Sequence, residues 1–153
     1  MPARVLKDRL RAVRRCIETT VCLCISGQLS IAQEHSSVPH AHLEAQAIQN
    51  PVRVDPESIA AGGRAYAKFC ANCHGASGRG NGRLATGIAA YGPRPSDLVD
   101  DVWQHGSTDG EIFVVIRDGI GPDFHMNGFQ RALQTDEIWN VVNYVRTLAI
   151  SKR

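Results

Sequence analysis

The pentapeptide Cys70-Ala71-Asn72-Cys73-His74 limits the possible folds and functions of this chain more than any other feature. If these residues form one helical turn, positions 70, 73 and 74 point to the same side, within about 100° of arc. Two thiols in that arrangement can form thioether bonds to the two vinyl groups of one haem, and the adjoining imidazole then lies beneath the iron. The motif therefore predicts a covalent haem c bound through Cys70 and Cys73, with His74 as the proximal iron ligand.

Three other roles for a C-x-x-C pair fit this sequence less well. A thioredoxin-like redox pair would need a preceding strand and a βαβ pattern, and neither is evident. A structural zinc site would need a second pair of Cys or His at fixed spacing, but Cys16, Cys22 and Cys24 all lie in the first 32 residues. A disulfide between two cysteines on one helical turn would be strained. Because C-x-x-C-H occurs once, we expect one haem per chain.

Residues 1–32 are typical of a secretory signal peptide. Six basic residues precede a moderately apolar run over 16–29, and small residues follow in Ser30-Ile31-Ala32. A positive start, a short apolar middle and small residues before the cleavage site are the parts that such a signal needs. We therefore expect export to the periplasm. An uncleaved, membrane-associated amphipathic segment is the alternative.

The charge balance argues against nucleic acid as a partner, because nucleic-acid binding needs a basic surface. The whole chain has 17 basic and 15 acidic residues, but residues 33–153 hold 11 basic and 13 acidic residues, a formal net charge of −2. Only two of these 11 cations are lysines. We therefore expect protein partners to dock without a ring of lysines and to be neutral or basic.

The chain after the leader divides into a lead-in and one domain. Residues 33–54 are rich in Ser, Pro, Gln and Ala and predict a flexible lead-in. Its three histidines, His35, His40 and His42, fit a solvated tail better than a metal site. Residues 55–150 predict a single domain.

Three helices explain the pattern of this domain, which we assign to the all-α class. Asp55-Pro56-Glu57 supplies an N-cap and a proline at the first helical position, and the stripe that follows continues to His74. Thr108 and Glu111 have the spacing of a capping box and start a second helix, for which a strand and turn are the alternative. A third helix begins at Thr135 and follows helical periodicity to the C-terminus.

Met126 is the candidate for the second axial iron ligand. It is the sole methionine after residue 32 and lies 52 residues beyond His74, in a loop over 121–129. Gly, Pro, Asp and Asn surround it, so it is not part of an apolar core stripe. Thioether ligation favours ferrous iron and raises the reduction potential, which suits an electron carrier. The neighbouring His125 is the alternative ligand.

From Asp55 to Leu148 the chain resembles the class I c-type cytochromes and is similar to small bacterial monohaem cytochromes. The resemblance rests on Gly62, Tyr66 and Cys70 at four-residue spacings, Cys-Ala-Asn-Cys-His-Gly at 70–75, Met126, and Ile138-Trp139-Asn140-Val141-Val142-Asn143-Tyr144-Val145. It implies a cytochrome c fold, in which three to five short helices wrap around one covalently attached haem. It also implies crossed N- and C-terminal helices, with Gly62 and Tyr66 packed against Val141 and Tyr144.

The same resemblance implies a partner for the other ring nitrogen of His74. A proline carbonyl in the loop over 92–98 would accept its N–H and raise the basicity of the imidazole. Pro95 is the favoured acceptor and Pro93 is the alternative. The chain departs from the family at Asn127, where Pro is common after the methionine.

These features predict an electron-transfer protein. No acid–base pair or nucleophile is apparent, so we assign no catalytic residue. We expect a periplasmic carrier of single electrons between a dehydrogenase or membrane redox complex and a terminal acceptor, with only peripheral or leader-mediated contact with the membrane. The alternatives are an electron-transfer subunit held in a dehydrogenase complex, and a haem enzyme or gas sensor with an open iron site.

Overall fold

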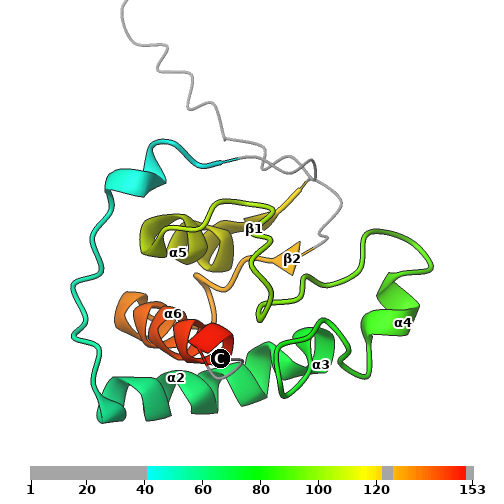
Figure 1. Cartoon of the computed structure of the whole chain (residues 1–153), viewed down its shortest axis with the longest axis horizontal. Helices are drawn as coiled ribbons and strands as arrows, with labels where there is room; N and C mark the ends of the chain where they lie inside the picture. Colours follow the sequence, from blue (N-terminus) through cyan, green and yellow to red (C-terminus); the bar gives the residue numbers. More distant parts are fainter. Residues whose placement is uncertain (1–40, 122–125, 151–153) are drawn as a thin grey trace, which may run out of the picture. The chain divides into compact units, whose positions relative to one another are not determined.

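The computed structural model describes residues 41–121 and 126–150, and the expected leader lies outside these ranges. Within them the chain is mainly helical, which confirms the all-α prediction (Figure 1). The elements follow in the order η2 (Ala45–Ala47), α2 (Pro56–Phe69), α3 (Ala71–His74), α4 (Ala85–Ile88), α5 (Asp109–Asp118), β1 (Gly119–Ile120), β2 (Met126–Asn127) and α6 (Thr135–Ile150). None of these helices is long and apolar enough to cross a bilayer.

Helix α2 begins where the sequence predicts. The Asp55 carboxylate accepts a hydrogen bond from the Ser58 amide at 2.9 Å, and Pro56 is the first helical residue. Both features suit a helix start, where backbone N–H groups lack carbonyl partners. The helix ends sooner than predicted, because Cys70 forms its C-cap and the short helix α3 carries the rest of the motif.

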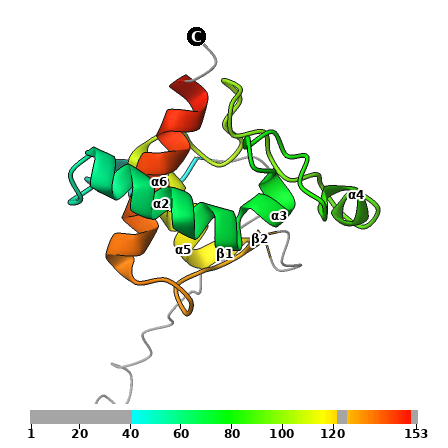
Figure 2. The same ribbon diagram turned by 90° about the horizontal axis from the view of Figure 1, so that it is seen from below.

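Helices α2 and α6 cross at close range, as the resemblance to cytochromes implies (Figure 2). A Cβ atom at Gly62 would collide with the carbonyl oxygen of Asn140 and lie 2.9 Å from Tyr144 Cβ. The ring centroids of Tyr66 and Tyr144 are 5.2 Å apart, and Val141 is buried in the same core. Glycine is required at position 62 because any side chain would force the two backbones apart.

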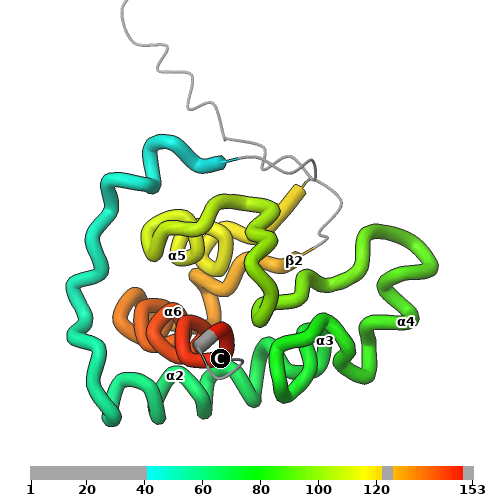
Figure 3. The backbone as a smooth tube through the Cα atoms, in the orientation of Figure 1, coloured from blue at the N-terminus to red at the C-terminus, as the bar shows by residue number. Residues whose placement is uncertain are grey.

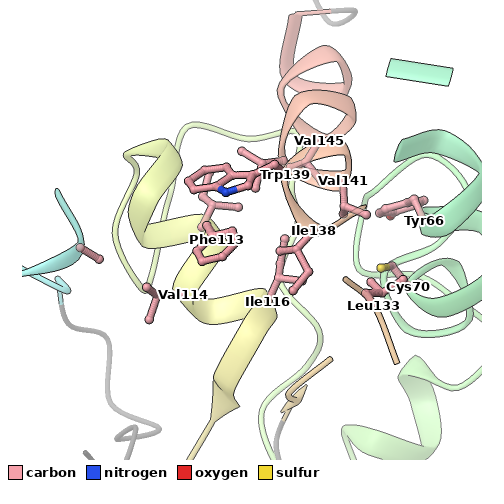
Figure 4. Close-up of a cluster of buried hydrophobic side chains, with 13 residues drawn as sticks. Tyr66, Cys70, Phe113, Val114, Ile116, Leu133, Ile138, Trp139, Val141 and Val145 are labelled. Carbon is pink, nitrogen blue, oxygen red and sulfur yellow. The ribbon is translucent and has the colours of Figure 1, made fainter. Parts of the chain in front are cut away.

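Helix α5 starts with the predicted capping box and is not a strand. The Glu111 amide donates to Thr108 Oγ1 at 3.3 Å, and the Thr108 amide donates to Glu111 Oε2 at 2.9 Å. On the core side, Phe113 stacks on Trp139 of α6 with a centroid separation of 4.1 Å (Figure 4). This packing joins α5 to α6.

Residues 42–54 form a strap on the helical domain (Figure 3), which corrects the prediction of a flexible lead-in for this part of the chain. The His42 amide and Gln46 Nε2 each donate to Glu111 Oε1 at 3.1 Å, and Ala45 is 3% exposed. Gly110 permits this approach, because a Cβ there would collide with the Ala45 carbonyl. Buried apolar contact and charge-assisted hydrogen bonds therefore hold a segment whose composition resembles that of a linker.

A polar network in the core holds the other end of the strap. Asn50 Nδ2 donates to Asn143 Oδ1 at 2.7 Å, and Asn143 Nδ2 donates to Ser58 Oγ at 2.7 Å. Ser58 Oγ in turn donates to Asn140 Oδ1 at 2.7 Å. Because buried amides need partners, this network specifies the position of the strap against α2 and α6.

Candidate haem site

Two neighbouring cavities bring the predicted haem-binding residues together. The larger has a volume of about 560 Å³ and is lined by Cys70, Cys73, His74 and Met126, among other residues. The smaller, of about 80 Å³, shares Cys70, His74 and Met126. The larger volume falls in the range of roughly 300–1,000 Å³ that cofactor pockets occupy. Two thiols, an imidazole and a thioether around one such cavity fit a c-type haem.

The two cysteines are free thiols in different settings. Cys70 is buried at the end of α2, and Cys73 is partly exposed on α3. Burial, with a smaller contribution from Cys73, raises the pKa of the Cys70 thiol to about 12. A thioredoxin-like pair instead requires a thiol whose pKa is lowered. The buried Cys70 thiol therefore does not have the lowered pKa of a redox-active cysteine.

His74 is held in one orientation by a backbone carbonyl. Its Nδ1 lies 3.0 Å from the Ser96 carbonyl oxygen. Because a carbonyl can only accept, this contact requires hydrogen on Nδ1 and leaves the Nε2 lone pair for a metal. Burial lowers the pKa of His74 and outweighs the opposing effect of the Ser96 hydrogen bond. The imidazole is therefore neutral at pH 7, the form in which an imidazole can bind a metal.

The acceptor is one residue beyond the predicted Pro95, and it is not the alternative Pro93. The reason lies in how the loop packs on the chain after the motif. The Pro95 carbonyl faces Gly80, where a Cβ atom would collide with it. The next carbonyl along the chain, that of Ser96, then faces His74.

Hydrogen bonds tie the chain after the motif back to the motif. The Gly80 amide donates to the His74 carbonyl at 2.8 Å, and the Leu84 amide donates to the Asn72 carbonyl at 2.9 Å. Gly75 and Gly80 have positive φ angles, +81° and +65°, a conformation that costs glycine little. The loop after His74 is thus shaped by its contacts with the motif.

Met126 reaches the cavities from a short β-ladder. Strand β2 pairs antiparallel with β1, with Ile120 opposite Met126 and Gly119 opposite Asn127. The ladder places Met126 among the residues that line both cavities together with His74. The sequence predicted a loop here and gave no sign of the pairing. The alternative ligand His125 lies outside the described residues.

The sequence did not single out several of the residues that line the smaller cavity, among them Trp103, Gln104 and His105. The Arg146 guanidinium lies 5.3 Å from the centre of the Trp103 ring and forms an ion pair with Asp109. These residues come from an irregular stretch between α4 and α5, where no periodicity marks a buried side chain. The signal available in the sequence was the presence of two aromatic residues, Tyr91 and Trp103, in a Gly- and Pro-rich segment.

No group of three or more potential metal-binding side chains of His, Cys, Asp or Glu occurs in the part of the chain that the structure describes. Of the three histidines of the lead-in, only His42 lies in that part. The side chains that fit a cofactor are the two thiols, the imidazole and the thioether around the larger cavity.

Crossed terminal helices around a cavity lined by two thiols, an imidazole and a thioether define a c-type cytochrome domain. The family model described as cytochrome c oxidase, cbb3-type, subunit III matches residues 57–145, and the chain belongs to this family. Membership implies covalently bound haem c.

Two curated relatives are cbb3-type cytochrome c oxidase subunits CcoP. The cbb3-type cytochrome c oxidase subunit CcoP of Rubrivivax gelatinosus is 32% identical over 129 residues, which cover 81% of this chain and 38% of the relative. CcoP of Azospirillum brasilense is 35% identical over 105 residues, covering 61% of this chain and 31% of the relative. The chain thus spans about a third of the length of these relatives.

Among solved structures, the chain is similar to one in the Kuenenia stuttgartiensis reducing HAO-like protein complex Kustc0457/Kustc0458. The TM-score is 0.57 at 27% sequence identity, and the match covers 66% of this chain and 49% of that one.

Proposed function

We propose that this protein transfers single electrons through one haem c per chain. Cys70 and Cys73 would hold the haem by thioether bonds, with His74 and Met126 as its axial ligands. The observation that carries the proposal is the convergence of these four side chains, from the junction of α2 and α3, from α3 and from β2, on one cavity. When bound, the haem supplies an iron that accepts and releases one electron.

The protein's own contribution is to orient the ligands and exclude water. The Ser96 carbonyl fixes the His74 ring, and burial keeps the imidazole neutral. Ile112, Ile116 and Val141 line the smaller cavity and give the site an apolar wall. If the protein holds both iron ligands in place in both oxidation states, the site rearranges little when an electron is transferred.

We further propose that the electron acceptor or donor is a respiratory complex. The family and the CcoP relatives belong to cbb3-type oxidases, which supports delivery of electrons to, or within, a terminal oxidase. A free periplasmic carrier and a subunit of a complex are both consistent with a haem domain of this kind. Isolation under mild conditions, followed by identification of co-eluting proteins, separates the two.

The proposal is tested first by how the haem is attached. In a host with a cytochrome c maturation system, the intact mass should exceed that of the polypeptide by one haem, and acid–acetone extraction should leave the colour with the protein. Cys70→Ala and Cys73→Ala should each sharply lower the yield of holoprotein. Extractable haem, or two haems per chain, would contradict the proposal.

The open-iron alternative is tested on the same material. If Met126 occupies the second axial position, the ferrous spectrum should not change when carbon monoxide is added. A rapid shift of the Soret band in the wild type would favour a gas-binding or catalytic haem. Met126→Ala serves as the positive control, because it should open the iron to carbon monoxide.

A further inference from the structure

The surface beside the motif differs in charge from the rest of the domain. Residues 71–96 include three arginines, Arg79, Arg83 and Arg94, and no Asp or Glu. All three are exposed. The other described residues hold 11 acidic and six basic side chains. A net negative domain therefore has one stretch that is locally positive.

The same stretch exposes large apolar side chains at the mouth of the larger cavity. Tyr91 is 95% exposed and Leu84 is 44% exposed, and they lie on either side of helix α4. Both side chains line the larger cavity, and so do Arg94 and Cys73. Helix α4 stands apart from the packed helices α2, α5 and α6 (Figures 1 and 2). We call Arg79, Arg83, Leu84, Tyr91 and Arg94 the α4 face.

Contacts with the motif hold this face in place. Arg83 Nε donates to Asn72 Oδ1 at 2.9 Å, and Asn72 lies between the two cysteines. The Gly82 amide donates to the Cys73 carbonyl at 3.0 Å. At the other end of the face, Gly80 lies against the Pro95 carbonyl, which places Arg79 next to the segment that carries Arg94. A surface that is ordered before binding loses less conformational entropy when a partner docks.

We propose that the α4 face is the docking surface for a redox protein that presents carboxylates around an apolar centre. The proposal rests on the electron-transfer function proposed above and specifies the chemistry of the partner. Arginines form bidentate hydrogen bonds with carboxylates, and exposed aromatic side chains provide the apolar centre typical of interfaces. The local charge thus reverses the preference for neutral or basic partners that the net charge predicts.

An anionic membrane is a less suitable occupant for this face. Segments that bind acidic lipids typically present clusters of about four to eight Lys or Arg residues, and the α4 face has three arginines. The position of the face at the mouth of the cavity favours a partner that must come close to the haem.

The test measures binding without electron transfer. The ¹⁵N-labelled holoprotein is titrated at low ionic strength with zinc-substituted plant plastocyanin, an acidic and redox-inert probe. We expect amide shifts concentrated over residues 79–94 that diminish as salt is added. The double variant Arg83→Gln/Arg94→Gln should raise the dissociation constant about tenfold. Arg64→Gln is the matched control, because Arg64 is exposed on α2, outside the face, and should change it less than about twofold.

Three results of this titration would overturn the docking proposal, and a fourth comes from a vesicle assay. They are the absence of saturable shifts, shifts centred outside residues 79–94, and an equal effect of Arg64→Gln. In the vesicle assay, the protein is sedimented with mixed phosphatidylcholine and phosphatidylglycerol vesicles. If it binds the vesicles through these arginines and does not bind plastocyanin, the face belongs to a membrane and the docking proposal is wrong. Failure of the electron-transfer function is seen separately, as a holoprotein that cannot be cycled between its ferric and ferrous spectra.

Discussion

The Tyr66 hydroxyl donates a hydrogen bond of 2.8 Å to the carbonyl oxygen of Gly75, the residue that directly follows His74. Helix α2 ends at Phe69, before the motif, but this bond connects it to the residue after the motif. Helix α2 therefore positions both ends of the motif. Tyr66 is 2% exposed. Burial, with smaller contributions from Cys70 and Tyr144, raises the pKa of its phenol, which therefore keeps its proton and remains a donor at neutral pH.

Tyr66→Phe should lower the free energy of unfolding of the holoprotein by about 1 kcal/mol, because it removes one of the two hydrogen bonds that the Gly75 carbonyl accepts and leaves only that from the Gly78 amide at 3.1 Å. Guanidinium unfolding followed by circular dichroism measures the change. Tyr144→Phe is the control, since no hydrogen bond to the Tyr144 hydroxyl occurs among the described residues. A loss of equal size in both variants would mean that the hydroxyl of Tyr66 has no special role.

Gly62→Ala should destabilise the crossing of α2 and α6 by about 2 to 3 kcal/mol, because the added methyl group collides with the backbone of α6. Gly87→Ala is the matched control, because no atom lies within 4 Å of a Cβ built there. On helix propensity alone, alanine should be neutral or stabilising by up to about 1 kcal/mol at either position. Opposite signs for the two variants, measured as shifts in Tm, would establish the close contact. Equal shifts would refute it.

Glu111 should make the protein sensitive to acid. Burial raises the pKa of this carboxylate, but hydrogen bonds from Thr108, Gln46 and Ser107 outweigh burial and lower it overall. A pKa that is lower in the folded state gives stability that is complete above the unfolded value of about 4.3 and is lost as the pH falls through the folded value. The free energy of unfolding of the wild type should therefore decrease as the pH is lowered from neutral to acid.

Glu111→Gln should cost about 2 to 4 kcal/mol at neutral pH, because an amide nitrogen then faces backbone donors. The difference from the wild type should shrink as the pH falls below about 4. Glu44→Gln provides the control, since Glu44 is exposed and makes no side-chain cap. If the wild type and Glu111→Gln lose stability in parallel with acid, ionised Glu111 does not hold the strap.

The parts of the fold that could be predicted depend on residues close together in the sequence. Asp55 caps an amide three residues away, and Thr108 and Glu111 cap each other across the same spacing. Local hydrogen-bonding residues at such spacings identify a helix start without knowledge of the rest of the fold. The C-x-x-C-H motif is equally local.

The parts that could not be predicted depend on long-range contacts. The strap is held by bonds between residues 69 and 93 positions apart, His42 with Glu111 and Asn50 with Asn143. Nothing near residue 42 indicates a buried partner. The carbonyl beside His74 is also hard to predict, because every residue has one and only the path of the loop selects Ser96.

Met126→Ala should abolish the weak far-red sulfur-to-iron band of the ferric holoprotein and lower its midpoint potential, because thioether ligation favours ferrous iron. Met126 is the only methionine among the described residues. It lies in the β-ladder and lines the same cavity as His74. Met126 borders the cavity from strand β2, so we propose that Met126 and not His125 binds the iron. His125→Ala should therefore leave the band and the potential nearly unchanged. If the wild type lacks the band, or if His125→Ala opens the iron to carbon monoxide, a bis-histidine haem replaces the His74–Met126 pair.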